Sequence, residues 1–341
     1  MKINKTFHIF PKAPLYVGGR STEDLTHPDG IIRSDTLASA IANALVSIGR
    51  LQSSDVKDFM DNVAFSSAFP LVKVKQESIY FFPKPAGFVL SRDIRERKKV
   101  KKARWFEKSI IENILTGQEI DLADVELDGQ FVFSRSMKDR LGNSVKISRL
   151  FAEQEHARAQ VARIPSDDSH PFFAVTKVFK AKDSIKAGLF FIAVGDDKYV
   201  DLVTEGLEIL QDTGFGSDRT VGWGHFEFEE ADDSALPTGA GNGDKAYSLG
   251  LYIPEGKEAL QDLKPLHYDL IERKGWVTVS GYLNVRRNGL FMFTEGSMFR
   301  INRNVYMAYF EEGTVRDVTP PFPKGMPEIY RSGKTIFICA K

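Results

Sequence analysis

The order of elements predicted between residues 170 and 230 constrains the fold more than any other feature of the sequence. Residues 170–180 and 187–195 are rich in Phe, Val and Ala, as buried strands are. Residues 198–210 repeat apolar side chains at helical spacing, and residues 213–230 begin as a glycine-rich loop and end as an alternating strand. This order predicts an α+β fold in which a helix packs on an antiparallel sheet.

Further elements are predicted before this unit. Residues 31–49 read as the clearest helix, with Ser34 as its N-cap and Gly49 just past its end. Runs of apolar and β-branched residues predict three strands in the first 85 residues, at 5–10, 63–72 and 78–85.

Two domains are expected from the length of 341 residues and from the way composition changes along the chain. Residues 229–245 have the Gly, Pro, Asp and Ser content of a linker. They separate an N-terminal domain, 1–235, from a strand-rich C-terminal domain, 246–341. Alternating basic and acidic blocks at about 86–160 indicate an insertion in the N-terminal domain.

The charge balance excludes a polycation that coats nucleic acid, because Lys plus Arg and Asp plus Glu both total 46. Any nucleic-acid site must therefore be a local patch. The single cysteine, Cys339, excludes an internal disulfide framework and a multi-cysteine zinc site, and the six histidines lack metal-binding spacing. With no long apolar run, we expect a cytoplasmic protein without a membrane partner, metal or cofactor.

The glycine-rich loop holds four glycines within eleven residues, with Arg219 between the two pairs. It lacks the last glycine of a dinucleotide fingerprint and the Gly-Lys-Ser/Thr of a P-loop, and it follows a helix rather than a strand. Two interpretations remain: a tight helix-to-strand turn, or a nest of backbone N–H groups and polar side chains that faces an anionic backbone. The nest would comprise Gly214, Gly216, Ser217, Arg219 and Thr220.

The N-terminal segment offers a second place for a phosphate. Residues 18–20, Gly-Gly-Arg, precede a loop, and residues 34–36, Ser-Asp-Thr, open the predicted helix. A helix N-terminus presents unpaired N–H groups that suit phosphate. An ordinary turn followed by an ordinary helix cap explains the same residues.

Residues 91–108 form a basic segment with nine Lys or Arg against three acidic residues, and the segment includes Trp105 and Phe106. Cations interleaved with aromatic rings can grip phosphates and stack on bases. A solvated helix face is the alternative, since that is the usual role of a run of charges.

Several stretches together resemble the RAMP superfamily of CRISPR proteins, and in particular the type III-A (Csm) effector complexes. The resemblance covers most of the chain in order. The glycine loop is shared by many RAMP proteins, whereas the helix opening, the proline-ended strands and the C-terminal tail are more specific. The stretches are RSDTLASAIANAL (33–45), FSSAFPL (65–71), YFFPKP (80–85), HARAQVARIPSDDSHPFFAVTKVFK (156–180), GFGSDRTVGWGHFEF (214–228) and IYRSGKTIF (329–337).

The resemblance implies two ferredoxin-like (RRM-like) domains with antiparallel sheets, a glycine-rich RAMP loop and an inserted basic thumb-like region. It also implies a non-catalytic RNA-binding subunit that holds the 5′ tag of the CRISPR RNA (crRNA). Its protein partners would be the large polymerase-like subunit and the backbone subunit of the Csm complex. In RNA-guided systems base pairing reads the sequence, while protein grips the backbone and ends.

The resemblance also implies which residues contact RNA, although Asp218 places beside Arg219 a negative charge that a phosphate nest would not favour. The implied residues form a cradle, an N-terminal turn, a helix opening, a basic insertion and its flank. They are Gly214, Gly216, Ser217, Arg219, Gly222 and Trp223; Gly18, Gly19 and Arg20; Ser34, Asp35 and Thr36; Lys98, Lys99, Lys101, Lys102 and Arg104; and Arg158 and Arg163.

Two other functions remain open at this point. A metal-independent RAMP endoribonuclease that processes repeat RNA would need a general acid or base, for which His27 is the candidate. An adaptor that joins two larger proteins would use exposed strands of residues 246–341 and would bind little RNA.

Overall fold

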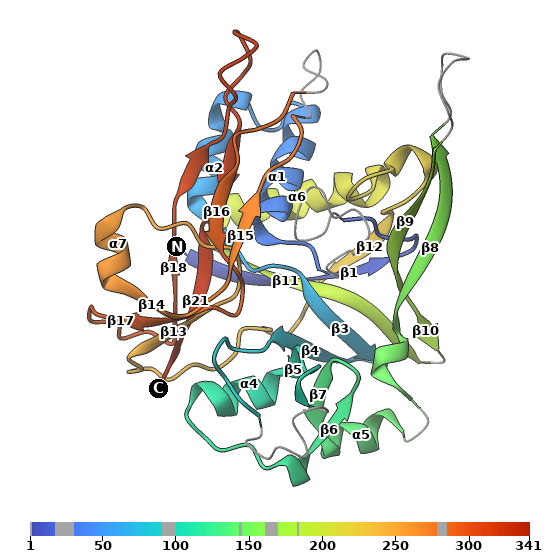
Figure 1. Ribbon diagram of the computed structural model, residues 1–341, viewed down its shortest axis with the longest axis vertical. Coiled ribbons are helices and arrows are strands. Elements are labelled where there is room, and N and C mark those ends of the chain that lie inside the picture. The colour runs from blue at the N-terminus through green and yellow to red at the C-terminus, as the bar shows by residue number, and fades with distance from the viewer. Residues whose placement is uncertain are drawn as a thin grey trace.

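The chain folds into a mixed α+β structure in which two large sheets are packed together (Figure 1). The computed structural model describes residues 2–17, 31–90, 100–142, 145–160, 170–182, 184–277 and 285–341, with backbone alone at 158–160 and 170–173. Within these ranges no helix is long and apolar enough to cross a membrane.

A ten-stranded sheet runs through the N-terminal part of the chain. Its main path follows the order β12 (Phe226–Glu230), β1 (Lys2–Pro11), β11 (Ile185–Asp196), β3 (Phe69–Val74), β4 (Glu77–Pro83), β5 (Trp105–Glu107), β7 (Phe131–Ser134) and β6 (Val125–Asp128). Two short strands, β2 (Val63–Phe65) and β10 (Ala181–Lys182), also pair with β11. Along this path the pairs are antiparallel except β5 with β7.

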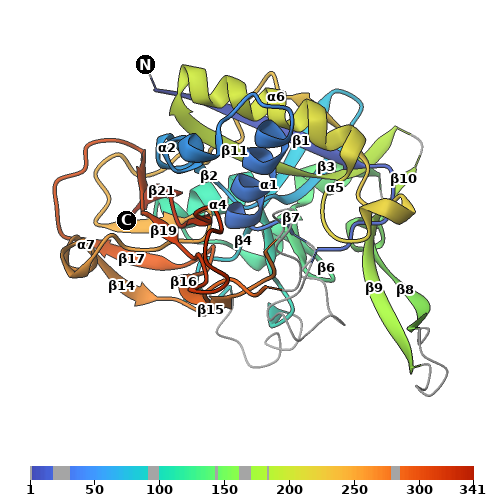
Figure 2. The same ribbon diagram turned by 90° about the horizontal axis from the view of Figure 1, so that it is seen from above.

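Helices cover one face of this sheet. α1 (Ser34–Ser47) and α6 (Asp197–Thr213) lie side by side on it, and α2 (Val56–Asn62) packs against α1 (Figures 1 and 2). The apolar residues that repeat at helical spacing in α1 and α6 face the sheet, except Ile48 just past the end of α1, which is 59% exposed. Side chains buried at this face include Phe7, Ile9, Leu37, Ile41, Leu45, Phe191, Val203 and Leu207.

The insertion covers part of the opposite face. α4 (Lys108–Leu115) and α5 (Arg135–Leu141) pack with β5, β6 and β7 into one hydrophobic core that also includes side chains of β11. Because both faces of β11 are covered, this strand is almost continuously buried rather than alternating. Trp105 and Phe106 lie in this core, 5% and 0% exposed, so the base stacking considered for these rings does not occur in this structure.

A long hairpin projects from the body next to β10 (Figure 1). It consists of β8 (Phe151–Gln160) and β9 (His170–Phe179), which pair along their full length. Segment 170–180 is therefore a strand as predicted, but it pairs with the strand before it. β11, the next long strand in the sequence, lies instead between β1 and β3.

The C-terminal part is rich in strands, as the sequence predicts. A five-stranded sheet has the order β14 (Leu263–His267), β17 (Met298–Ile301), β13 (Lys245–Ser248), β21 (Thr335–Ala340) and β18 (Tyr309–Glu312), with α7 (Lys257–Asp262) before β14. Two further ribbons pair β15 (Leu270–Arg273) with β16 (Leu290–Phe293) and β19 (Val315–Asp317) with β20 (Tyr330–Ser332).

The two parts of the chain share a core. Tyr247 on β13 and Ile336 on β21 pack in the same apolar cluster as the insertion, and the Tyr247 hydroxyl donates to the carbonyl oxygen of Pro83 at 2.5 Å. Tyr247 and Ile336 are both fully buried. The C-terminal sheet is therefore fixed against the end of β4.

Candidate nucleic-acid interface

The glycine loop turns the chain from α6 into β12. Gly214 ends the helix with φ +81°, and its amide donates to the Leu210 carbonyl at 2.8 Å. Gly216, Gly222 and Gly224 also have positive φ angles, of +93°, +87° and +79°. Residues other than glycine adopt positive φ angles only with strain, so the backbone path of the loop requires glycine at these four positions.

Close backbone contacts explain two of the glycines further. A Cβ atom on Gly216 would lie 2.5 Å from the Tyr16 carbonyl oxygen, and one on Gly224 would lie 2.0 Å from the Phe215 carbonyl oxygen. The amide of Ser217 donates to Tyr16 O at 3.0 Å, and that of Phe215 donates to Gly224 O at 2.9 Å.

These contacts correct the nest hypothesis for Gly214 and Ser217, whose amides are bound to Leu210 O and Tyr16 O. The amides of Phe215, Ser217 and Gly224 are bound inside the protein, the last of them to Pro14 O at 3.0 Å, so they do not face a phosphate. The glycines allow the loop to pack on the segment that follows β1.

The outer side of the loop faces solvent. Gly216, Ser217, Arg219 and Gly222 are exposed, while Phe215 between the first two glycines is buried. A short 3₁₀ turn, Arg219–Val221, follows Asp218, which has a left-handed φ of +61°. The loop thus presents a guanidinium and hydroxyl groups on a backbone fixed from behind.

Trp223 connects the loop to the projecting hairpin. Its ring lies 5.9 Å from that of Tyr16, nearly perpendicular to it, and 4.8 Å from that of His156 on β8. His156 Nε2 is 3.0 Å from the Thr176 hydroxyl on β9. Sequence reasoning missed Tyr16 and His156, since their partners come from distant segments. The sequence signal that could have placed His156 was the alternating pattern of a strand around it.

The start of α1 does not form the predicted phosphate site. Arg33, not Ser34, is the N-cap residue, and Ser34 and Asp35 are 2% and 0% exposed. The Ser34 amide donates to Ser67 Oγ at 3.1 Å, and the Ser34 hydroxyl accepts from the Leu251 amide at 2.9 Å. Ser34 and Asp35 are therefore enclosed by the C-terminal part of the chain, which corrects their assignment as RNA contacts.

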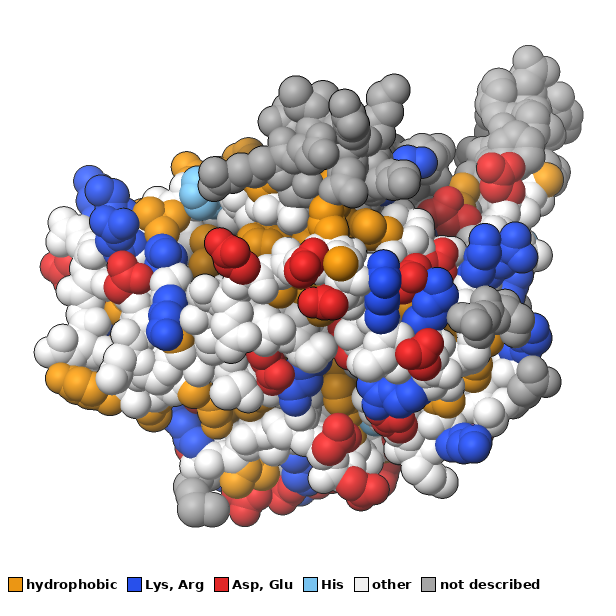
Figure 3. Space-filling model, turned by 90° about the horizontal axis from the view of Figure 1, so that it is seen from below, with side chains coloured by type: hydrophobic (Ala, Val, Ile, Leu, Met, Phe, Trp, Pro, Cys, Tyr) orange, Lys and Arg blue, Asp and Glu red, His pale blue; other side chains and the backbone are white. Residues whose placement is uncertain are grey.

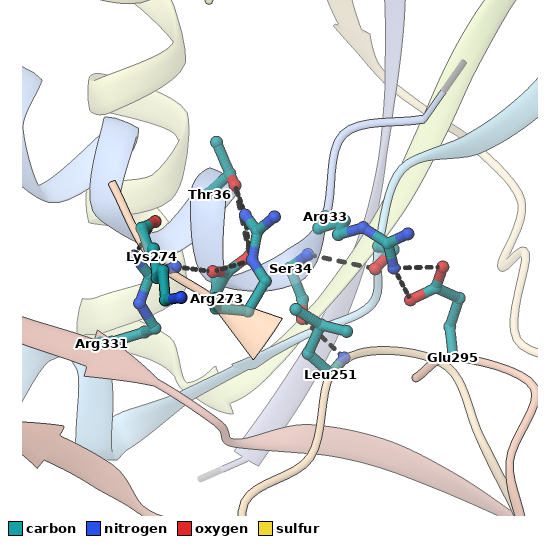
Figure 4. A network of polar contacts seen from close by, with 10 residues as sticks. Arg33, Ser34, Thr36, Leu251, Arg273, Lys274, Glu295 and Arg331 are labelled. Atoms are coloured by element: carbon teal, nitrogen blue, oxygen red, sulfur yellow. Dashed lines mark hydrogen bonds and ion pairs between the residues drawn. The ribbon is translucent and has the colours of Figure 1, made fainter. Parts of the chain in front are cut away.

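Asp35 forms ion pairs with Arg273 and Arg331 from the C-terminal part, and Figure 4 shows these two arginines beside the start of α1. Arg273 donates to both carboxylate oxygens, at 2.9 and 3.1 Å, and to the Thr36 hydroxyl at 2.9 Å. Arg331 also donates to the carboxylate. Burial alone would raise the pKa of Asp35, but Arg273 and Arg331 hold it well below its usual range. Asp35 is thus an internal anion at the start of α1.

The basic insertion is only partly described. Lys101 and Lys102 are exposed, and the guanidinium of Arg104 stacks on the Trp105 ring with its carbon 4.9 Å from the centroid. The underside of the molecule mixes Lys and Arg with Asp and Glu rather than showing one positive field (Figure 3). The predicted residues that lie outside the described part are Gly18, Gly19, Arg20, His27, Lys98, Lys99 and Arg163, and only the backbone of Arg158 is described.

No group of three or more His, Cys, Asp or Glu side chains in the described ranges could hold a metal ion. The candidate interface consists of the glycine loop, the rings of Tyr16, Trp223 and His156, and the β8–β9 hairpin. Arg219 contributes an exposed positive charge to it.

Comparisons with known proteins agree with this architecture. Residues 241–339 match the CRISPR Csm4 C-terminal domain family. Csm4 of Streptococcus thermophilus is 24% identical over 294 residues, which cover 84% of each chain. Csm4 of Mycobacterium tuberculosis is 28% identical over 117 residues, which cover 34% of this chain and 38% of the relative.

The fold is also similar to that of a solved structure. A chain from the crystal structure of a Csm3–Csm4 subcomplex of a type III-A CRISPR-Cas interference complex superposes with a TM-score of 0.64. The match covers 99% of both chains at 19% identity. The predicted resemblance is confirmed: the chain is similar to Csm4 proteins along most of its length, and residues 241–339 match the Csm4 C-terminal domain family.

Proposed function

We propose that this protein is a non-catalytic RNA-binding subunit of a type III-A CRISPR (Csm) complex that holds the 5′ tag of the crRNA. It bridges the large polymerase-like subunit and the backbone filament. The similarity to Csm4 proteins over 84% of the chain supports the assignment to such a complex. The solved subcomplex joins Csm4 to Csm3, which supports a protein partner within such a complex by analogy.

One observation carries the RNA-binding proposal: the glycine loop is fixed from behind and exposed in front. Its inner amides are bound to the Tyr16 segment, while Ser217 and Arg219 face solvent. Ordering an RNA strand on a rigid loop sacrifices less conformational entropy than ordering both partners. A guanidinium on such a loop can hold a phosphate through paired hydrogen bonds.

The strand orders support the ferredoxin-like assignment that we propose for both parts. The path β12-β1-β11-β3 with α1 and α6 on one face follows the β-α-β-β-α-β pattern. β14-β17-β13-β21 repeats this order around α7. Residues 302–334, all described, contain only strands and loops. The second helix of the β-α-β-β-α-β pattern therefore has no counterpart in the C-terminal part.

The experiment compares Arg219→Gln with Arg50→Gln in the full chain. Arg50 is also exposed but is paired with Glu205 at 2.9 Å, so its replacement removes the same charge without touching the loop. We expect Arg219→Gln to weaken binding of a tag-containing RNA about tenfold and to lower the salt slope by about one. Equal affinities for the two variants would contradict the proposal and favour an adaptor that binds little RNA.

The absence of catalysis is tested by incubating the protein with repeat RNA in EDTA. We expect no specific cleavage. Specific cleavage that disappears in His27→Ala would instead establish the RAMP endoribonuclease function, in which histidine acts as general acid or base.

A further inference from the structure

Arginines outnumber carboxylates where the C-terminal part meets the start of α1. Arg33, Arg273, Arg287 and Arg331 lie within one electrostatically coupled group with Asp35, and Glu295 pairs with Arg33. Four guanidinium groups therefore face two carboxylates, which leaves two positive charges (4 − 2) among the described residues. Most of this group is buried, and charges at such positions are normally paired.

Three of the four arginines have partners. Arg33 donates to both Glu295 oxygens, at 2.8 and 3.0 Å (Figure 4). Arg273 and Arg331 share the Asp35 carboxylate, and Arg331 also donates to the Lys274 carbonyl oxygen at 3.2 Å. The Nε atom of Arg331 has no acceptor among the described residues, and the Arg331 side chain is only 4% exposed.

Arg287 is the uncompensated member of the group. No ion pair joins it to a carboxylate in the described residues, and its buried Nε has no hydrogen-bond partner there. Burial and the neighbouring charges of Arg331 and Arg273 lower the pKa of Arg287 to about 10. Gly275 leaves room for this guanidinium, because a Cβ there would lie 3.1 Å from Arg287 Nη2.

A half-buried guanidinium beside two others attracts an anion. Its planar fork matches the paired oxygens of a phosphate, and surrounding positive charge strengthens the contact where water is partly excluded. We propose that Arg287, backed by Arg273 and Arg331, forms a binding site for a phosphate group. On the proposed function above, this group is a backbone phosphate of RNA.

The segments that extend the β15–β16 ribbon, in which Arg287 lies, have further features of a nucleic-acid surface. Trp276, 50% exposed, pairs across this ribbon with Arg286, whose guanidinium carbon lies 4.8 Å from the ring centroid. An exposed indole can stack on a base, and the adjacent arginine adds charge. RNA is therefore a better fit than an isolated small anion, and the experiment has one arm for each.

The test uses the full chain with Arg287→Gln and, as the matched control, Arg50→Gln, which removes an exposed arginine charge that is paired with Glu205 on α6. Thermal unfolding is followed with and without inorganic phosphate, and binding of a labelled single-stranded RNA is measured over a range of salt. An arginine kept for a ligand destabilises the free protein, so we expect Arg287→Gln to raise the Tm by about 2 °C without phosphate. Phosphate should then raise the Tm of the wild type and of Arg50→Gln but not that of Arg287→Gln.

RNA affinity should fall about tenfold in Arg287→Gln, with a salt slope lower by about one. A lower Tm in Arg287→Gln, with unchanged responses to phosphate and RNA, would show a purely structural arginine and overturn the inference. Loss of the phosphate response with unchanged RNA affinity would overturn RNA as the source of the phosphate. If Arg219→Gln weakens RNA binding and Arg287→Gln does not, the proposed function stands and this inference fails.

Discussion

The glycine loop and the start of α1 carry the same kind of sequence signal, small or polar residues beside backbone N–H groups, yet they lie in opposite environments. Ser217 and Arg219 of the loop face solvent, whereas Ser34 and Asp35 are enclosed. In both places the fold itself binds amides that seemed available for phosphate. Side chains, rather than bare amides, therefore determine what each region can bind.

The difference follows from what covers each region. Leu251, Arg273 and Arg331 from the C-terminal part close over the start of α1, and Asp35 takes the place that an external anion would occupy. Among the described residues, the loop packs against the Tyr16 segment on its inner side. A helix N-terminus binds a phosphate only where nothing inside the protein has already neutralised it.

The largest effect on the free energy of unfolding should come from removing the buried carboxylate at the start of α1. Asp35→Asn leaves Arg273 and Arg331 without their carboxylate, and removal of one partner of a buried ion pair destabilises by about 3–5 kcal/mol. Urea denaturation measures this loss, with Glu205→Gln as the control because it breaks the exposed pair with Arg50. A loss below about 1 kcal/mol would mean that Asp35 is not the internal anion described above.

The Asp35 carboxylate also determines the direction in which the stability of the protein changes with pH. The folded pKa of Asp35 is depressed, so its contribution to stability is complete above the unfolded value of about 3.9 and disappears as pH falls through the folded value. Asp35→Asn should therefore lose less stability on acidification than the wild type. Parallel acid titrations of the two proteins would contradict this assignment.

A smaller loss of stability is expected from alanine substitutions in the glycine loop, and it should differ between Gly224 and Gly222. Gly224→Ala places a methyl group 2.0 Å from the Phe215 carbonyl oxygen at a positive φ, so we expect a loss of about 2–4 kcal/mol from strain and overpacking. Gly222 also has a positive φ, but a Cβ there would meet no described atom within 4 Å, so Gly222→Ala should lose about 1 kcal/mol. Equal losses would show that backbone conformation alone, not close packing, requires these glycines.

The smallest effect tests the basic insertion against the loop. Lys101→Gln combined with Lys102→Gln removes two exposed charges, and we expect RNA affinity to fall about two- to fourfold at low salt. Fluorescence anisotropy with the same RNA compares this variant with Arg219→Gln. A larger loss in the lysine variant would move the main RNA contact from the loop to the insertion.

The sequence predicted local elements well and long-range neighbours poorly. α1, α6, β12 and the positive-φ glycine after α1 follow from apolar spacing and turn chemistry within a few residues. The burial of Asp35 does not, because its partners lie 238 and 296 positions away in the chain. The pairing of β9 with β8 and the contact of Trp223 with His156 were unpredicted for the same reason.

Photo-crosslinking tests the central claim most directly. A tag-containing RNA with 4-thiouridine at successive positions is bound to the protein, irradiated and mapped by mass spectrometry. The account predicts crosslinks within residues 216–223 and at Tyr16 or His156, and none at Ser34 or Asp35. Crosslinks at the start of α1, or none in the loop, would contradict it.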